Sequence, residues 1–166
     1  MQKVHFIGIG GTGISAIALL LLEKGWQVSG TDKSASRYFD AVTAKGARTL
    51  LGHSPELALS ADVIVRSSAV HDDDPEVLAA RAKGIPVLKR NDFLPELTAG
   101  YQTLAVAGSH GKTTCSAMLI TMLRGLGVDP TFILGAQVRL LKTNPLFGTG
   151  CLFVIEADES AHLFVG

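Results

Sequence analysis

Residues 4–32 read VHFIGIGGTGISAIALLLLEKGWQVSGTD. An apolar run at 4–8 predicts a short strand, and the Ala-, Ile- and Leu-rich run at 12–24 predicts a helix. A second strand is expected at 26–30, followed by Asp32. This is a strand–helix–strand unit, in which the helix crosses over between two parallel strands.

The same alternation continues along the chain. Helices are expected near 35–45 and 75–83, with strands at 62–65 and 85–88. The first ~95 residues therefore predict a Rossmann-like α/β fold, an open parallel sheet with helices on both faces. A closing helix and link are expected at 91–100.

A second α/β pattern starts after that link. Its expected elements are a strand at 102–107, a helix at 111–126, and apolar segments at 131–134 and 151–155. These ~66 residues have too few elements to close a core of their own. We expect one domain at 1–98 and an incomplete second domain at 99–166.

The composition excludes several classes of protein. Of 166 residues, 47% are hydrophobic and 18% charged, and the net charge is zero, so no electrostatic case exists for nucleic acid or an acidic membrane surface. The longest apolar window, 14–22, is too short to span a membrane. Two cysteines are too few for a disulfide framework. We expect a cytoplasmic protein without a targeting segment.

The first glycine loop fits the pattern G-x-G-x-x-G through Gly8, Gly10 and Gly13, directly after a strand and before a helix. Such a loop lets a diphosphate approach the backbone and the helix N-terminus, and Asp32 stands where a ribose-binding acid is expected. The pattern favours a nucleotide ligand, with NAD as the default. The alternative is glycines that only permit close helix–sheet packing.

The second glycine loop lies within AVAGSHGKTTCSAML, residues 105–119. It resembles a triphosphate-binding loop that is two residues shorter than the common form. Lys112 is expected on the β- and γ-phosphates of ATP, backbone N–H groups of 108–112 around them, and the Thr113 hydroxyl on Mg²⁺. The alternative is a helix start capped by threonine.

Several polar residues follow predicted strands and are further candidates. Glu156 ends an apolar strand, so it is expected at the carboxyl edge of the sheet as a second Mg²⁺ ligand. The alternative for Glu156, Asp158 and Glu159 is a solvated turn. Ser67 and Ser68 are expected near phosphate or sugar, with helix capping as the alternative. His53 lies on a loop near the expected position of a nucleotide base.

Taken together, these motifs resemble the Mur ligases. The resemblance rests on GIGGTGIS, SSAV, DPEVLAARAKGIPVLKR, the short loop GSHGKTT, DPTFILG and EADES, which occur in that order along the chain. It implies three domains, of which this chain would hold the first and the start of the second. It also argues against an NAD site at the first loop.

The resemblance implies an ATP-dependent amide ligase of peptidoglycan synthesis that joins L-alanine to UDP-N-acetylmuramate through an acyl phosphate. It implies catalytic roles for Lys112 and Glu156, and Mg²⁺ on Thr113 and Glu156. The implied UDP-sugar residues are Gly10, Gly11, Thr12, Gly13, Asp32, His53, Ser67 and Ser68; the implied ATP residues are Gly108, Ser109, His110, Gly111, Lys112, Thr113 and Thr114.

Two positions depart from the family pattern. Cys115 stands where a third threonine is usual, and Ala161 where an aspartate is usual. The amino-acid site of the family lies beyond these 166 residues, so we expect this chain alone to bind ligands without ligating them. Two alternatives stay open: the family's ligase for recycled murein tripeptide, and an NAD-binding oxidoreductase.

Overall fold

The computed structural model describes residues 2–135, 138, 141 and 145–156. The chain divides into two compact units, Met1–Phe93 and Leu94–Gly166. The division falls within helix α5 (Arg90–Thr98). Assigning a UDP-sugar to the first unit and ATP to the second remains a prediction.

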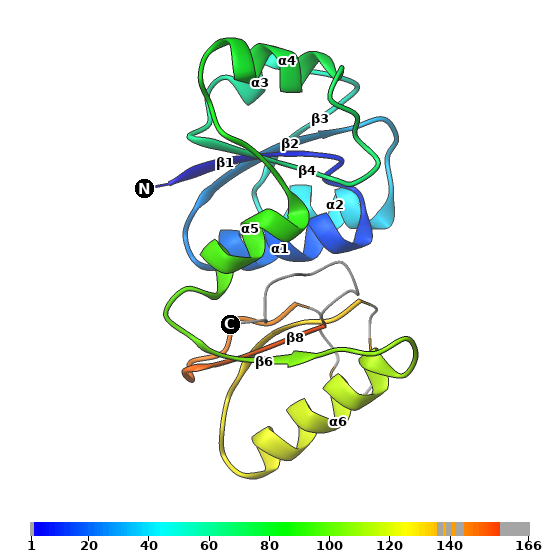
Figure 1. The fold of residues 1–166 in the computed structure, drawn as a ribbon, viewed down its shortest axis with the longest axis vertical. Coiled ribbons are helices and arrows are strands. Elements are labelled where there is room, and N and C mark those ends of the chain that lie inside the picture. Colours follow the sequence, from blue (N-terminus) through cyan, green and yellow to red (C-terminus); the bar gives the residue numbers. More distant parts are fainter. Residues whose placement is uncertain (1, 136–137, 139–140, 142–144, 157–166) are drawn as a thin grey trace. The chain divides into compact units, whose positions relative to one another are not determined.

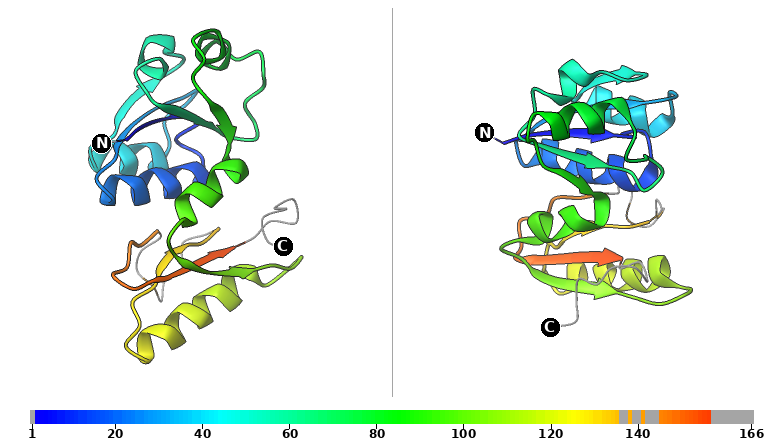
Figure 2. Two further views of the ribbon diagram at one scale, coloured as in Figure 1. Left: turned by 60° about the vertical axis from the view of Figure 1, so that its left-hand side comes forward. Right: turned by 45° about the horizontal axis from the view of Figure 1, so that its top comes forward.

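The first unit is built on a five-stranded parallel sheet in the order β3-β2-β1-β4-β5 (Figure 1). Its strands are β1 (Lys3–Ile7), β2 (Gln27–Asp32), β3 (Arg48–Leu51), β4 (Val63–Arg66) and β5 (Val87–Lys89). Helices α1 (Thr12–Glu23) and α2 (Arg37–Ala44) cover one face, and α3 (Pro55–Ala58) and α4 (Pro75–Ala82) cover the other (Figures 1 and 2). The expected Rossmann-like arrangement is confirmed.

The chain order explains where a ligand can bind in this unit. β1 pairs with β2 on one side and β4 on the other, so the crossovers leaving β1 and β4 turn to opposite faces of the sheet. A crevice opens where the strand order reverses, outside the carboxyl ends of the strands. The first glycine loop follows β1 and therefore lies at that crevice.

The sequence patterns missed β3 and α3. β3 is a four-residue edge strand whose Leu50 and Leu51 are 45% and 56% exposed, so it shows neither alternation nor a buried apolar run. α3 is a single turn that begins at Pro55 after the Ser54 cap. The expected strand at 26–30 also runs on to Asp32.

The second unit contains a three-stranded parallel sheet in the order β6-β8-β7, with helix α6 packed on it. The elements are β6 (Gln102–Val106), α6 (Lys112–Gly125), β7 (Thr131–Ile133) and β8 (Leu152–Glu156). Ile120, Phe132 and Val154 are fully buried at its centre. Within the described part of the chain, no helix is long and apolar enough to cross a membrane.

Gly30 is required by the close approach of β2 to β1 and the first glycine loop. A Cβ at Gly30 would lie 2.7 Å from the carbonyl oxygen of Phe6 and 2.6 Å from Cδ1 of Ile9. We expect Gly30→Ala to lower the free energy of unfolding by about 1–3 kcal/mol, because backbone cannot move aside cheaply. Urea denaturation followed by Trp26 fluorescence measures this, since Trp26 is the single tryptophan and packs on Phe93.

Gly125→Ala is the matched control, because it makes the same change at a glycine with open space around it and an ordinary φ. Gly125 is the last residue of α6, where alanine suits a helix at least as well as glycine, so this variant should lose no stability. Equal stabilities of the two variants would show that the loop and β1 relax to admit the methyl group.

Candidate functional site

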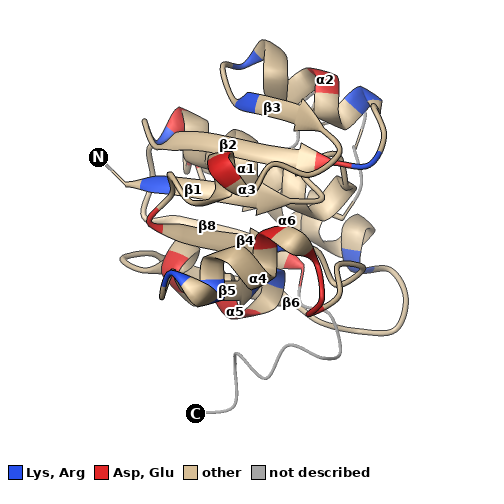
Figure 3. Cartoon of the chain, turned by 90° about the horizontal axis from the view of Figure 1, so that it is seen from above, with Lys and Arg blue, Asp and Glu red and all other residues tan. Residues whose placement is uncertain are grey.

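A cavity of about 310 Å³ lies at the carboxyl ends of β1, β2 and β4 in the first unit. Five of the expected UDP-sugar residues line it: Gly10, Gly11, Asp32, His53 and Ser67. Asp32 ends β2, and an acidic run, Asp72 to Asp74, leads into α4 (Figure 3). The sequence patterns did not single out Lys33, Ser34, Ser36 or Asp74, which also line the cavity.

Thr12, Gly13 and Ser68 do not line the cavity, although they were expected at the ligand. Ser68 is exposed. A Cβ at Gly13 would collide with the guanidinium of Arg90, so that arginine lies against the first turn of α1. A side chain at Gly13 would require the end of the Arg90 side chain to move.

The backbone of the first glycine loop is largely used within the fold. The N–H groups of Gly8 and Ile9 donate to the Thr31 carbonyl at 2.8 and 3.0 Å, and that of Gly11 donates to the Gly8 carbonyl at 3.1 Å. Gly11 caps α1 without a side chain. The N–H groups that helix geometry leaves without an intrahelical partner are those of the first turn, including Thr12 and Gly13. An anion at this loop would bind there.

Asp32 and Ser36 hold the backbone of Gly10 through hydrogen bonds to its N–H and its carbonyl group. The Gly10 N–H donates to Oδ2 of Asp32 at 2.8 Å, and the Ser36 hydroxyl donates to the Gly10 carbonyl at 2.9 Å. A Cβ on Gly10 would lie 2.9 Å from that carboxylate oxygen. One oxygen of Asp32 thus orders the loop itself, and the ribose contact expected of Asp32 stays a prediction.

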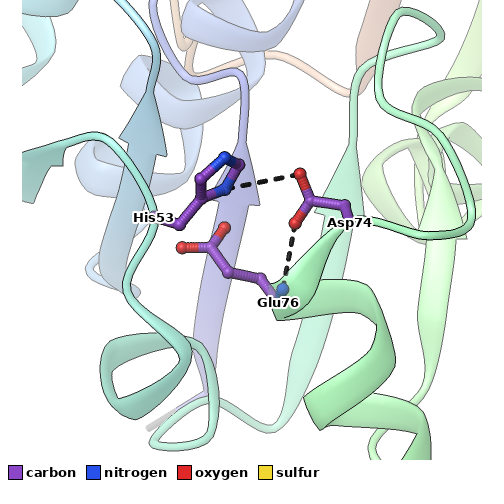
Figure 4. Close-up of side chains that lie close together, drawn as sticks. All are labelled: His53, Asp74 and Glu76. Atoms are coloured by element: carbon purple, nitrogen blue, oxygen red, sulfur yellow. Dashed lines mark hydrogen bonds and ion pairs between the residues drawn. The ribbon is translucent and has the colours of Figure 1, made fainter.

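A network of hydrogen bonds lies beneath the cavity, centred on Glu76 in the first turn of α4. Glu76 is fully buried and accepts a hydrogen bond from the Thr31 hydroxyl at 2.7 Å and another from the Ser54 N–H. His5, also fully buried, places Nε2 3.6 Å from the same carboxylate. Asp74 lies 3.4 Å from Nδ1 of His53 (Figure 4).

The pKa of Glu76 is held below its usual value. Burial alone would raise it, but the nearby His5 ring and hydrogen bonds from the Ser54 N–H and the Thr31 hydroxyl favour the charged form and outweigh burial. Glu76 is therefore a carboxylate near neutral pH. Its negative charge is stabilised by two hydrogen-bond donors, from β2 and the loop after β3, and by the His5 ring on β1.

The segment 67–74 forms another wall of the cavity and is held by Arg66. This buried arginine ends β4, donates to the Val70 carbonyl, and donates to Oδ1 of Asp72 at 2.9 Å. Arg81 donates to the same oxygen at 2.6 Å. Hydrogen bonding from Arg81 and the charge of Arg66 lower the pKa of Asp72. The wall is thus tied to the sheet by charge-assisted hydrogen bonds.

The second glycine loop, at 107–111, joins β6 to α6. Gly108 and Gly111 have φ of 144° and 77°, conformations that favour glycine, and Gly111 is the N-cap of α6. Lys112 Nζ donates to the Gly108 carbonyl at 2.6 Å, so its ammonium folds back over the loop. Ser109 and His110 are exposed. The loop thus presents an ammonium and the first-turn N–H groups of α6, including those of Thr113 and Thr114.

Glu156 ends β8 and pairs with Val106, the last residue of the strand that leads into this loop. A Cβ on Gly135 would lie 2.8 Å from Glu156 Oε2 and 3.9 Å from the Thr113 hydroxyl oxygen, so the two oxygens face the same small space. Oε1 of Glu156 is buried and has no hydrogen-bond partner among the described residues. A carboxylate with one oxygen towards the Thr113 hydroxyl and the other without a partner suits the ligand preference of Mg²⁺. Asp158, Glu159 and Ala161 lie outside the described residues.

Sequence comparison assigns the chain to a family. The sequence model of the Mur ligase family, described as its catalytic domain, matches residues 3–102, which is more than half of the chain. The chain belongs to the Mur ligase family. Its matched residues contain the whole first cavity, and the match ends before the loop that carries Lys112.

Curated relatives extend the likeness of this Mur ligase chain past residue 102. UDP-N-acetylmuramate–L-alanine ligases of Frankia casuarinae and Aquifex aeolicus are 50% and 46% identical to it over 99% of its length. The chain spans only 34% and 36% of those two proteins. It therefore corresponds to about a third of each relative.

Solved Mur ligase structures share the fold. A UDP-N-acetylmuramate-alanine ligase from Thermotoga maritima is 31% identical, with a TM-score of 0.81, over 94% of this chain and 37% of that one. A UDP-N-acetylmuramate:L-alanyl-γ-D-glutamyl-meso-diaminopimelate ligase from Neisseria meningitides is 30% identical, with a TM-score of 0.84, over 96% of this chain and 53% of that one. Backbone similarity thus does not separate these two kinds of Mur ligase.

Proposed function

We propose that this chain is the UDP-sugar-binding and ATP-binding part of a Mur ligase that joins L-alanine to UDP-N-acetylmuramate. The observation that carries the proposal is the presence of two phosphate-binding glycine loops in one chain, each opening a helix at the carboxyl end of a parallel strand. Hydride transfer needs one nucleotide site, whereas ATP-driven ligation to a nucleotide-sugar needs two.

The first cavity is the proposed site for UDP-N-acetylmuramate. The N–H groups of Thr12 and Gly13, which follow the cavity-lining Gly11 but do not themselves line the cavity, would bind the diphosphate. Ser67 and His53 line the cavity. Asp32 acts by ordering the Gly10 peptide. This arrangement supports a nucleotide-sugar and does not require the direct ribose contact of an NAD site.

The second loop is the proposed site for ATP. Lys112 and the loop N–H groups would offset the negative charge of the β- and γ-phosphates, which otherwise repels an approaching carboxylate. The carboxylate of the muramate then attacks the γ-phosphate, ADP leaves, and the amine of L-alanine displaces phosphate from the acyl phosphate. Mg²⁺, held by Thr113 and Glu156, would supply further charge neutralisation of the phosphates.

We do not assign a binding site for the amino acid acceptor to these 166 residues. The alanine ligases named above are about three times as long as this chain, and we place the alanine site in the part of such a protein that the chain does not contain. The tripeptide ligase remains a second candidate because its fold is equally similar. Both candidates take the same UDP-sugar.

Calorimetric titration of the chain with UDP-N-acetylmuramate tests the first site. We expect the UDP-sugar to bind and NAD not to bind, and Gly11→Val to weaken binding at least about tenfold by projecting a branched side chain into the cavity. Gly11 has φ of −74°, which any residue adopts, and a Cβ there would lie 3.3 Å from the Gly8 carbonyl oxygen, so valine needs only a small shift of the loop.

Gly125→Val, at an open position in the second unit with an ordinary φ, is the matched control and should bind the UDP-sugar as the wild type does. Binding of NAD in place of the UDP-sugar would overturn the proposal and return the oxidoreductase to first place.

A further inference from the structure

The first turn of α4 holds the loop at 52–54 from two sides. Asp74, the N-cap of α4, uses Oδ1 to accept the Glu76 N–H at 2.9 Å and turns Oδ2 towards the His53 ring. Glu76, two residues on, accepts the Ser54 N–H from below. The Gly52 N–H donates to the Asp32 carbonyl at 2.8 Å, which ties the start of this loop to β2.

The charge of Asp74 orients the His53 imidazole. Its Oδ2 lies 3.4 Å from Nδ1, so a proton on Nδ1 is favoured over a lone pair there (Figure 4). In that tautomer Nε2 is the acceptor. Both residues line the cavity, His53 with a side chain that is 38% exposed and Asp74 with one that is only 9% exposed.

The same three side chains, His53, Asp74 and Glu76, lie close enough together to resemble a metal site, with their nearest polar atoms within 4.8 Å. The hydrogen bonds argue for another role. Both oxygens of Glu76 already accept hydrogen bonds, from Ser54 and Thr31, and Oδ1 of Asp74 caps the helix. A metal ion would have to share the Glu76 oxygens with these donors, whereas positioning of the loop uses the hydrogen bonds as they stand.

We infer that Asp74 and Glu76 are positioning residues for the UDP-sugar, Asp74 through the His53 ring and Glu76 through the backbone of Ser54. The inference rests on the proposed function, because it assigns the mechanism by which that site keeps His53 in place. Asp74 and Glu76 of the DPE segment would thus position the ligand site in addition to starting helix α4.

Calorimetric titration of UDP-N-acetylmuramate into a double-mutant cycle tests the part of Asp74. Asp74→Asn keeps an equally good helix cap and removes the charge beside His53. We expect it to weaken binding about fivefold, and to have almost no further effect in a His53→Ala background. An effect of Asp74→Asn that persists in that background would show direct ligand contact or a general structural role, and would overturn the inference.

Glu76→Gln tests the part of Glu76. The glutamine oxygen can still accept the Ser54 N–H and its amide can donate to Thr31, so the affinity should stay within about twofold of the wild type. A loss as large as that of Asp74→Asn would show that the charge of Glu76, and not its hold on Ser54, is what the ligand senses. Nitrogen-15 shifts of the His53 ring should report a proton on Nδ1 in the wild type and a mixture in Asp74→Asn.

Asp73→Asn, a neighbouring exposed aspartate, is the matched control and should leave affinity and ring shifts unchanged. The titrations are repeated with a chelator and with Zn²⁺; a Zn²⁺-dependent gain in affinity would assign the three side chains to a metal and reject positioning. Absence of UDP-sugar binding by the wild type would instead reject the proposed function, so the two failures are distinguishable.

Discussion

The Glu76→Ala variant is expected to lose about 3–5 kcal/mol of the free energy of unfolding of the first unit, the typical cost of breaking a buried charged network from one side. Alanine would leave the Ser54 N–H and the Thr31 hydroxyl without their acceptor and would remove the carboxylate that faces the buried His5 ring, all beneath the cavity. A typical domain has about 5–15 kcal/mol in total, so this change removes much of the margin. Urea denaturation at neutral pH, followed by Trp26 fluorescence, measures the loss.

The same network makes stability depend on pH. Since the pKa of Glu76 is lowered on folding, its contribution is fully present above the unfolded pKa and is lost as the pH falls through the lower folded value. The wild type should therefore lose stability on acidification below about pH 4.5, the ordinary value for a glutamic acid. Glu76→Ala lacks this part of the acid dependence, so the two stabilities should approach each other in acid.

Glu56→Ala is the matched control for Glu76→Ala, because Glu56 is an exposed glutamate in the first turn of α3. It should cost no more than about 1 kcal/mol. A Glu76→Ala loss no greater than that of the control would mean that water enters and replaces the missing acceptor.

Local patterns were sufficient to predict the parts of the fold that depend on neighbours in sequence. The two glycine loops each sit between a strand and a helix, and both were expected from spacing alone. β3 was not expected, because an exposed edge strand of four residues carries little apolar signal. The position of Glu156 at the end of β8 was expected, and its role on Mg²⁺ stays a prediction.

Contacts between distant residues could not be predicted in the same way. Asp32 was expected at a ribose, which stays a prediction, but the hydrogen bond from the Gly10 N–H to its carboxylate was not expected. The two residues are 22 apart in sequence, and the register of β2 on β1 brings them together. Glu76 follows an N-cap aspartate and a proline, which is a typical helix start, and nothing local marks it as buried. Its burial depends on β1, β2 and the loop after β3 meeting under α4.

The Lys112→Ala variant should bind ATP at least about thirtyfold more weakly than the wild type, the lower end of the cost of truncating one partner of a charged hydrogen-bonded pair. In the ligand-free loop the ammonium folds back on the Gly108 carbonyl, within the loop that would surround the phosphates. Without it, the protein would offer the β- and γ-phosphates N–H dipoles and bound Mg²⁺ but no ammonium. Fluorescence titration with a labelled ATP analogue and Mg²⁺ measures the change.

Three further variants separate the possible causes of such a loss. Lys45→Ala removes a lysine that is 62% exposed in the first unit and should bind ATP normally. Lys112→Arg keeps the charge on a longer, planar group and should fall between wild type and Lys112→Ala. Glu156→Gln should lower the affinity for ATP mainly when Mg²⁺ is present, so that the affinity depends less on Mg²⁺ than in the wild type. The variant alters the carboxylate that faces Thr113 and leaves Lys112 in place. Undiminished ATP binding by Lys112→Ala would mean that the second loop does not hold the triphosphate, and would contradict the proposal that ATP bound there drives the ligation.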